Sequence, residues 1–164
     1  MNEATLADGR TVALRGIRPD DLERLEVFHS KLSPETIRKR FFTPHPHLTP
    51  AELIRFTTVD GDERLAIIAL CDDELVGVGR YESYPGTDDV EGAWVVRDDF
   101  QGLGVGRILA AEVVEEARRH GKKRLIAETL AENIPMRRVL LKLGLNHTQK
   151  FRDGVIELVL FLDD

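Results

Sequence analysis

Three glycines at alternate positions mark the stretch of this chain that is best suited to bind an anion. They lie in the run Gln101-Gly102-Leu103-Gly104-Val105-Gly106-Arg107. Glycine removes side chains that would keep a ligand away from the backbone, and the first turn of a helix offers unpartnered N–H groups and partial positive charge. A glycine turn that leads into a helix therefore indicates a cradle for phosphate, although a plain tight turn before a helix has the same pattern.

A strand and a long helix are expected on either side of this turn. The run Ala93-Trp94-Val95-Val96 has the apolar, β-branched character of a strand. After the glycines, apolar residues recur on one helical face as far as Ala117, and Gly121 follows at the position of a C-terminal cap. The glycine spacing differs from that of a dinucleotide-binding fingerprint, and Arg107 stands where a P-loop needs lysine followed by serine or threonine.

One carboxylate, Glu91, falls near the start of the expected strand. In a regular strand it shares a face with Ala93 and Val95. A carboxylate inside an apolar strand is costly unless it has a partner or a task. The residues alone favour a simpler interpretation, in which Glu91 is solvated at a frayed strand end beside Asp88 and Asp89.

Composition limits the class of protein. The 164 residues fit one domain, no apolar run reaches membrane-spanning length, and the N-terminus does not resemble a signal peptide. The single cysteine, Cys71, cannot form an internal disulfide, so we expect a cytoplasmic protein in which Cys71 is a core residue rather than a nucleophile.

The charge is uneven along the chain. Residues 1–100 hold 12 basic and 20 acidic residues, a net charge of −8, while residues 101–164 carry +2. The basic excess follows the glycine turn, where a phosphate would need positive charge, and the acidic first hundred residues are suited to a cationic amine. For both parts of the chain, a solvated surface without a functional role is the default interpretation. No basic stripe supports nucleic-acid binding.

The remaining pattern predicts a mixed α/β domain. We expect helices opened by Asp20-Asp21, Ser33 and Thr49, the long helix over 105–120 and another over 133–143. Strands are expected over 11–17, 64–72, 74–84, 90–96, 124–130, 147–152 and 155–162. His45 and His47 lie between prolines with no third ligand nearby, so no metal site is expected.

The glycine run resembles the Q/R-x-x-G-x-G/A signature with which GNAT N-acetyltransferases hold the pyrophosphate of acetyl-coenzyme A. The order of elements is similar to the GNAT fold over nearly the whole chain. This implies a single GNAT domain over residues 1–164, with a mixed, largely antiparallel, twisted sheet that is flanked by helices and splayed at the acetyl-CoA site. Looser strings resemble the catalytic domain of bacterial Pat-type protein lysine acetyltransferases: Leu32-Ser33-Pro34-Glu35-Thr36, Arg40-Phe41-Phe42, Thr58-Val59-Asp60, Glu91 to Val96, Leu130 to Met136, and Lys142-Leu143-Gly144-Leu145.

The resemblance implies acetyl-CoA as co-substrate and no metal. Asn133 is placed against the pantetheine arm, although it is also a good helix N-cap. Arg107, with Arg138 and Lys142, is a candidate for the 3′-phosphate, with solvated helix charges as the alternative for the last two. The implied cofactor-binding residues are Trp94, Val95, Val96, Gln101, Gly102, Leu103, Gly104, Val105, Gly106, Arg107 and Asn133.

The resemblance also implies that Glu91 is the general base, because the Pat-type catalytic glutamate occupies this place. Many GNAT enzymes carry a tyrosine as general acid where this chain has Leu140. The leaving group is a thiolate whose conjugate thiol has a pKa of ~8.5, so it can depart without a general acid on the protein. Tyr81 and Tyr84 are substitute donors, with packing roles as the favoured alternative.

These points predict an acetyl-CoA-dependent N-acetyltransferase that moves an acetyl group to a primary amine by direct attack. The Pat resemblance implies a protein lysine as acceptor; a small amine is the alternative, and a non-catalytic coenzyme A sensor would have no need for Glu91. We expect no nucleic-acid or membrane partner and leave a homodimer open. Pat-type proteins usually carry a regulatory domain, for which 164 residues leave no room.

Overall fold

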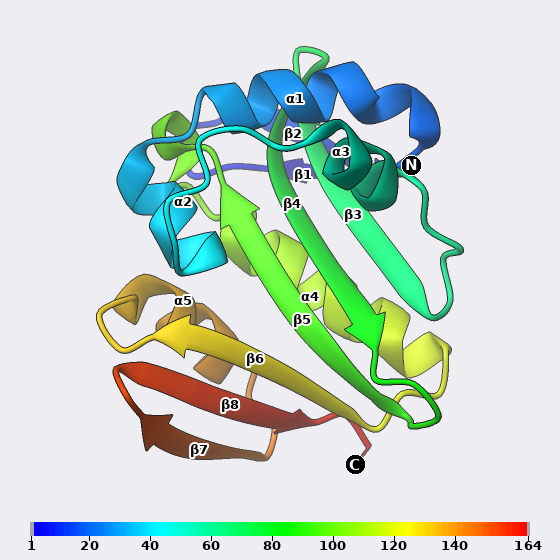
Figure 1. Ribbon diagram of the computed structural model, residues 1–164, viewed down its shortest axis with the longest axis vertical. Coiled ribbons are helices and arrows are strands. Elements are labelled where there is room, and N and C mark those ends of the chain that lie inside the picture. Colours follow the sequence, from blue (N-terminus) through cyan, green and yellow to red (C-terminus); the bar gives the residue numbers. More distant parts are fainter. Residues whose placement is uncertain (1, 164) are drawn as a thin grey trace.

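One eight-stranded sheet forms the centre of the computed structural model, which describes residues 2–163 (Figure 1). The strands follow the order β1-β2-β3-β4-β5-β6-β8-β7, and every neighbouring pair is antiparallel except β5 and β6. Their bounds are β1 Asn2–Thr5, β2 Thr11–Gly16, β3 Arg64–Cys71, β4 Glu74–Ser83, β5 Asp89–Val96, β6 Arg124–Leu130, β7 His147–Arg152 and β8 Val155–Phe161.

Helices cover both faces of the sheet. One face carries α1 (Leu22–Ser30), α2 (Pro34–Phe41) and α3 (Pro50–Thr57), and the other carries α4 (Val105–Arg119) and α5 (Ile134–Leu141), as Figure 1 shows. Two short 3-10 helices, Pro19–Asp21 and Asp98–Phe100, precede α1 and the glycine turn. Each face has its own apolar core, so the sheet is buried on both sides where the helices lie. No helix of residues 2–163 is long and apolar enough to cross a membrane.

The parallel pair β5–β6 separates after three residues. Asp89, Val90 and Glu91 pair with 124–126, and beyond Glu91 the two strands diverge into the V visible in Figure 1. This confirms the splay that the family resemblance implied. The edge of β5 beyond Glu91 therefore has no β6 partner for its backbone groups.

Close packing of α4 on β4 fixes the position of the glycine turn. Gly77 leaves room for two α4 side chains, because a Cβ at this position would lie 2.9 Å from both Leu109 Cδ1 and Val105 Cγ1. Gly79 does the same for Trp94 and Val113, at 2.8 and 3.0 Å. The start of α4 is thus held directly against the sheet.

Most of the expected helix boundaries are confirmed. Ser33 Oγ accepts a hydrogen bond from Thr36 N, and Thr49 and Glu52 form a reciprocal capping box. No sequence pattern predicts β1, because its residues are mostly exposed and show no apolar alternation. Cys71 is buried, as expected.

Asp21 differs from its expected role as a helix cap. It stands at the N-cap position of α1, but its side chain makes no cap hydrogen bond to that helix. Its fully buried carboxylate accepts two hydrogen bonds of 2.7 Å from Arg15, one of 2.7 Å from Arg18 N and one of 3.3 Å from Arg24. Asp21 therefore ties β2 and the connecting turn to α1.

We predict that Asp21→Asn lowers the free energy of unfolding by about 3–5 kcal/mol, because it leaves the Arg15 guanidinium without its partner. Burial by itself raises the pKa of Asp21, but hydrogen bonds from Arg15 and Arg18, and the charges of Arg15 and Arg24, lower it on balance. A carboxyl group whose pKa is lowered by folding stabilises the protein above its unfolded pKa of ~3.9, and this contribution is lost as the pH falls through the folded pKa.

Urea unfolding measured from neutral to acid pH tests this. The difference in the free energy of unfolding between wild type and Asp21→Asn should be constant above about pH 5 and should become smaller in acid. Asp20→Asn is the matched control, because Asp20 is the exposed neighbour in the same turn. Equal stability of the two variants at neutral pH would contradict the role given to Asp21.

Candidate active site

A cavity of about 340 Å³ lies where β5, the glycine turn, α2 and α5 meet. Nine of the eleven expected cofactor residues line it: Trp94, Val95, Val96, Gln101, Gly102, Gly104, Gly106, Arg107 and Asn133. The other two lie outside its lining. Val105 is buried against Gly77, and the Leu103 carbonyl accepts a hydrogen bond from Ala7 N at 3.0 Å.

The glycine turn has a backbone that glycine alone adopts easily. Gly102 has a φ of 77°, and Gly104, the N-cap of α4, has a φ of 103°. Gly104 O accepts the first helical hydrogen bond, from Ile108 N at 3.1 Å. The preceding N–H groups have no partner inside the helix, so this end of the cavity is a site for negative charge.

Backbone groups on β5 face the gap at alternate residues. Arg97 N donates to Val76 O on β4 at 2.9 Å, so by strand alternation the N–H and C=O groups of Trp94 and Val96 point away from β4, toward the gap. Val96 O already accepts from Gln101 Nε2 at 2.9 Å. The backbone groups that face the gap are thus the N–H and C=O of Trp94 and the N–H of Val96, whereas Val95 offers the cavity its side chain.

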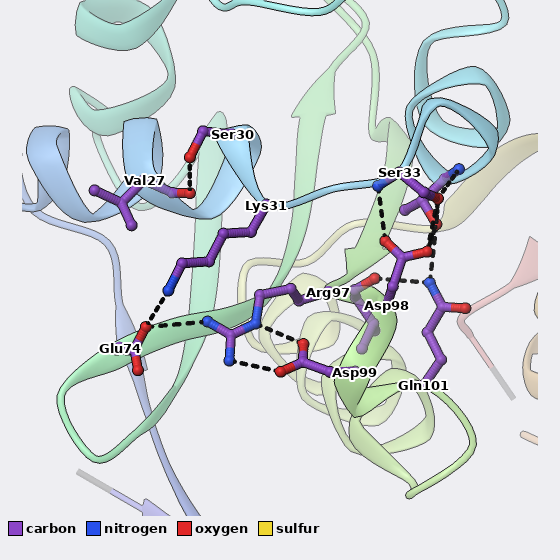
Figure 2. A network of polar contacts seen from close by, with 11 residues as sticks. Val27, Ser30, Lys31, Ser33, Glu74, Arg97, Asp98, Asp99 and Gln101 are labelled. Carbon is purple, nitrogen blue, oxygen red and sulfur yellow. Dashed lines mark hydrogen bonds and ion pairs between the residues drawn. The ribbon is translucent and has the colours of Figure 1, made fainter.

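A polar network joins α2 to the glycine turn (Figure 2). The Asp98 carboxylate accepts from Ser33 N, Ser33 Oγ and Thr36 Oγ1 at 2.6 to 2.9 Å. Gln101 Nε2 donates to Thr36 Oγ1 at 3.1 Å as well as to Val96 O. The Gln101 side chain thus holds three elements together at the rim of the cavity that it lines.

Glu91 occupies the point where the sheet opens. It is the last β5 residue paired with β6 and also pairs with Glu82 on β4, so it is not at a frayed end. Its side chain is exposed on the face of the sheet that carries α1–α3. Tyr84 Oη donates to Glu91 Oε2 at 3.4 Å. Burial, followed by the charge and hydrogen bond of Glu91, raises the pKa of Tyr84 to about 12, so Tyr84 stays protonated at neutral pH.

Among the other candidate residues, some line the cavity and others lie in the core or on the surface. Tyr81 is buried and donates to Asp62 O at 2.8 Å, away from the gap, and Leu140 is fully buried. Asn133 caps α5 by accepting from Met136 N at 3.4 Å, and it also lines the cavity. Arg107 reaches the cavity, whereas Arg138 and Lys142 are exposed and do not line it.

The structure adds site residues that the sequence did not single out. Thr129, on β6, has a buried hydroxyl with no hydrogen-bond partner within residues 2–163, and it lines a small extension of the gap beside Asn133. The main cavity also includes Thr36, Lys39, Arg40, Phe100, Pro135, Met136 and Val139. The helical periodicity of 133–143 marked Met136 and Val139 as apolar, but not as cavity walls.

His45, one of the two loop histidines, lies beside His29 of α1 and has local partners. His29 Nε2 lies 2.7 Å from His45 O, and His45 Nε2 lies 3.0 Å from the Glu52 carboxylate. In the part of the chain that the structure describes, no group of three or more His, Cys, Asp or Glu side chains is placed to hold a metal ion.

Comparison with known proteins agrees with this geometry. The family model of the acetyltransferase (GNAT) domain matches residues 11–146. The chain belongs to the GNAT acetyltransferase family. Acetyltransferase PA5475 of Pseudomonas aeruginosa is 35% identical to this GNAT chain over 144 residues, which cover 85% of the chain and 77% of that relative. Acetyltransferase Pat of Mycolicibacterium smegmatis is 28% identical over 83% of the chain, but the match covers only 41% of that longer protein.

Solved structures show the same GNAT fold. The GNAT domain of S. lividans PAT has a TM-score of 0.91 and is 34% identical, with 98% of this chain and 96% of that one covered. The protein yncA from Salmonella typhimurium, solved with its cofactor acetyl-CoA, has a TM-score of 0.73 and 20% identity, with 93% and 95% covered. The second likeness concerns the fold alone.

Proposed function

We propose that this GNAT chain transfers the acetyl group of acetyl-CoA to a lysine side chain of a protein, with Glu91 as the general base. The observation that carries the proposal is the opening between β5 and β6, with Glu91 at its vertex and the glycine turn at the far end of the adjoining cavity. Glu91 does not itself line the cavity. A ligand whose phosphates lie in the glycine turn would extend along β5 toward the opening at whose vertex Glu91 lies.

The cavity suits each part of acetyl-CoA. The glycine turn and the start of α4 suit the pyrophosphate, with Arg107 beside them. The free backbone edge of Trp94 suits the amides of pantetheine, and the orphan Thr129 hydroxyl offers a further polar partner. Presence of acetyl-CoA in the yncA structure, on the same fold, supports this assignment.

The reaction needs few groups from the protein. A lysine ammonium has a pKa of ~10.4, so at neutral pH only on the order of one amine in 10³ is free to attack. Glu91 takes one proton from the ammonium, and the amine nitrogen then forms a bond to the thioester carbonyl carbon. The C–S bond breaks to release the thiolate, and the second proton on the nitrogen passes to this thiolate or to water. Trp94 N–H faces the gap and is a backbone donor available to the developing oxyanion.

Gly106 offers a test of the donor site. Its φ lies outside the left-handed region, and an added Cβ would make an ordinary contact of 3.8 Å with Val96 Cγ2, so substitution need not strain the turn. We predict that Gly106→Glu weakens acetyl-CoA binding by more than about tenfold, because it places negative charge in the cradle. Gly106→Ala, which adds a methyl group only, should stay within a few-fold of wild type.

Isothermal titration calorimetry of the two folded variants with acetyl-CoA measures the difference. Undiminished binding by Gly106→Glu would show that the pyrophosphate lies elsewhere and would remove the glycine turn from the donor site.

Glu91→Gln tests the general base. The variant keeps the shape and removes the basicity, so kcat should fall by about 10²–10⁴ while acetyl-CoA affinity holds. The difference in kcat between wild type and Glu91→Gln should become smaller at high pH, because more of the acceptor amine is already deprotonated there. A thiol-release assay across pH measures both effects.

Asp88→Asn is the matched control, because Asp88 is an exposed carboxylate just before β5. A Glu91→Gln enzyme within a few-fold of wild type at neutral pH would exclude Glu91 as the base and turn attention to water or Tyr84.

Acceptor identity needs a separate experiment. The likeness to the GNAT domain of S. lividans PAT over nearly the whole chain supports a protein lysine. We expect enzyme-dependent acetyl-lysine when a proteome is incubated with the protein and acetyl-CoA and analysed by mass spectrometry, with Glu91→Gln as the inactive control. Absence of such sites, together with rapid turnover of a free amine, would reassign the chain as a small-molecule acetyltransferase.

A further inference from the structure

An arginine is buried on the face of the sheet that carries Glu91. Arg80 lies in the middle of β4, directly between Ala66 on β3 and Ala93 on β5. The two small neighbours leave space above the sheet, and the Arg80 side chain fills it beneath α3 with a residue exposure of only 8%. Burying a guanidinium is costly unless a counter-charge accompanies it.

No carboxylate of residues 2–163 pairs directly with Arg80, although the more distant charge of Glu82 acts on it. Among residues 2–163, none lies within 4.0 Å of the Arg80 guanidinium nitrogens; its contacts are the Phe56 ring at 4.7 Å and the Phe56 carbonyl at a long 3.4 Å. This carbonyl belongs to the C-terminal turn of α3, whose partial negative charge is shared with Arg64 through the carbonyls of Arg55 and Thr58.

The nearest acid on the same face is already occupied. The Glu82 carboxylate accepts from Arg55 at 2.6 Å and from Arg64 at 2.8 Å. Burial, followed by the positive charge of Arg40, lowers the pKa of Arg80 to about 9, which still leaves it charged at neutral pH.

Arg40 is a second cation that pairs directly with no acid among residues 2–163, although the charges of Glu91 and Glu82 act on it. It lies in the last turn of α2, half-buried, with its guanidinium 4.6 Å from the centre of the Phe41 ring and, among residues 2–163, no carboxylate within 4.0 Å. Arg40 and Arg80 together line a cavity of about 30 Å³ whose other walls are largely apolar, such as Phe41, Phe56 and Val95. Arg40 also lines the donor cavity, so the small cavity adjoins the donor cavity at Arg40.

The opposite side of the opening is acidic. Glu91 is in register with Ile126 on β6, so Glu128, two residues further on, points to the same face, and Glu128 pairs with Glu157 on β8. The charges of Glu91, Glu128 and Glu157 all act on Tyr84, which places them around one hydroxyl. The acceptor side thus has an acidic edge along β5–β6–β8 and a basic edge formed by Arg40 and Arg80.

We propose that Arg40 and Arg80 form an anion subsite for the acceptor, so that the preferred acceptor is an amine accompanied by a carboxylate. The amine lies at Glu91 and the carboxylate takes the counter-ion place beside Arg80. This inference rests on the proposed acetyl transfer. The carboxylate has two sources: an Asp or Glu side chain next to the acceptor lysine of a protein, or the α-carboxylate of a free amino acid.

Paired acceptors test the subsite. One pair is a lysine peptide flanked by glutamate and the same peptide flanked by glutamine; the other is a free amino acid and its α-amide. The wild type should favour the acidic member of one pair at least tenfold in kcat/KM, mainly through KM, and the pair that shows the preference identifies the source.

Arg80→Met keeps the apolar stem and removes the charge, so it should bring this ratio to about one while the rate on the neutral acceptor stays within a few-fold. Arg55→Met is the matched control, because Arg55 lies on the same face but already pairs with Glu82, and it should keep the ratio. If Arg80→Met fails to fold, Arg40→Met should reduce the same ratio.

The outcomes separate the two proposals. Equal turnover of acidic and neutral acceptors by the wild type, or a preference that survives Arg80→Met, overturns the anion subsite and leaves acetyl transfer intact. Turnover of no acceptor in either pair, with retained acetyl-CoA binding, overturns both.

Discussion

Incomplete pairing of β5 with β6 is the constraint on which the site depends. Backbone N–H and C=O groups inside a domain need partners, and a strand edge that opens within the sheet must find them elsewhere. At the vertex, Glu91 is still paired on both sides, whereas three residues later Trp94 faces an open gap. A ligand that offers amides can complete the edge as a strand would, so the opening provides both space and hydrogen-bonding direction.

The surrounding elements keep this opening from closing. On one face, α4 packs against β4 at Gly77 and Gly79, which fixes the start of the helix and hence the glycine turn. On the other, Asp21 joins α1 to β2 at the far end of the helical layer. Between them, Asp98 and Gln101 secure α2 to the end of β5. Each contact uses a rigid element, so the position of the ligand is determined by packing rather than by flexible loops.

Local patterns in the sequence predicted much of this arrangement. The glycine spacing, the apolar strand before it and the amphipathic helix after it identified the cavity floor, since each pattern lies within a few residues. The caps at Ser33 and Thr49 were predictable for the same reason. By contrast, the hydrogen bonds between Asp98 and the residues Ser33 and Thr36 join positions more than 60 residues apart, and no local sequence pattern predicts them. The burial of Arg80 was not predicted, because an arginine in a strand normally extends its side chain to solvent.

The network around Gln101 connects the proposed donor site to the proposed acceptor site. Thr36 belongs to the helix that carries Arg40, and Val96 belongs to the strand that leads into the glycine turn, so one amide nitrogen bridges both walls. Any acceptor that shifts α2 changes the free energy of the donor pocket, and linkage requires the donor to change acceptor affinity by the same factor. Substitutions in α2 that adapt the chain to a new acceptor therefore also alter its affinity for the donor, which restricts the routes by which its specificity can evolve.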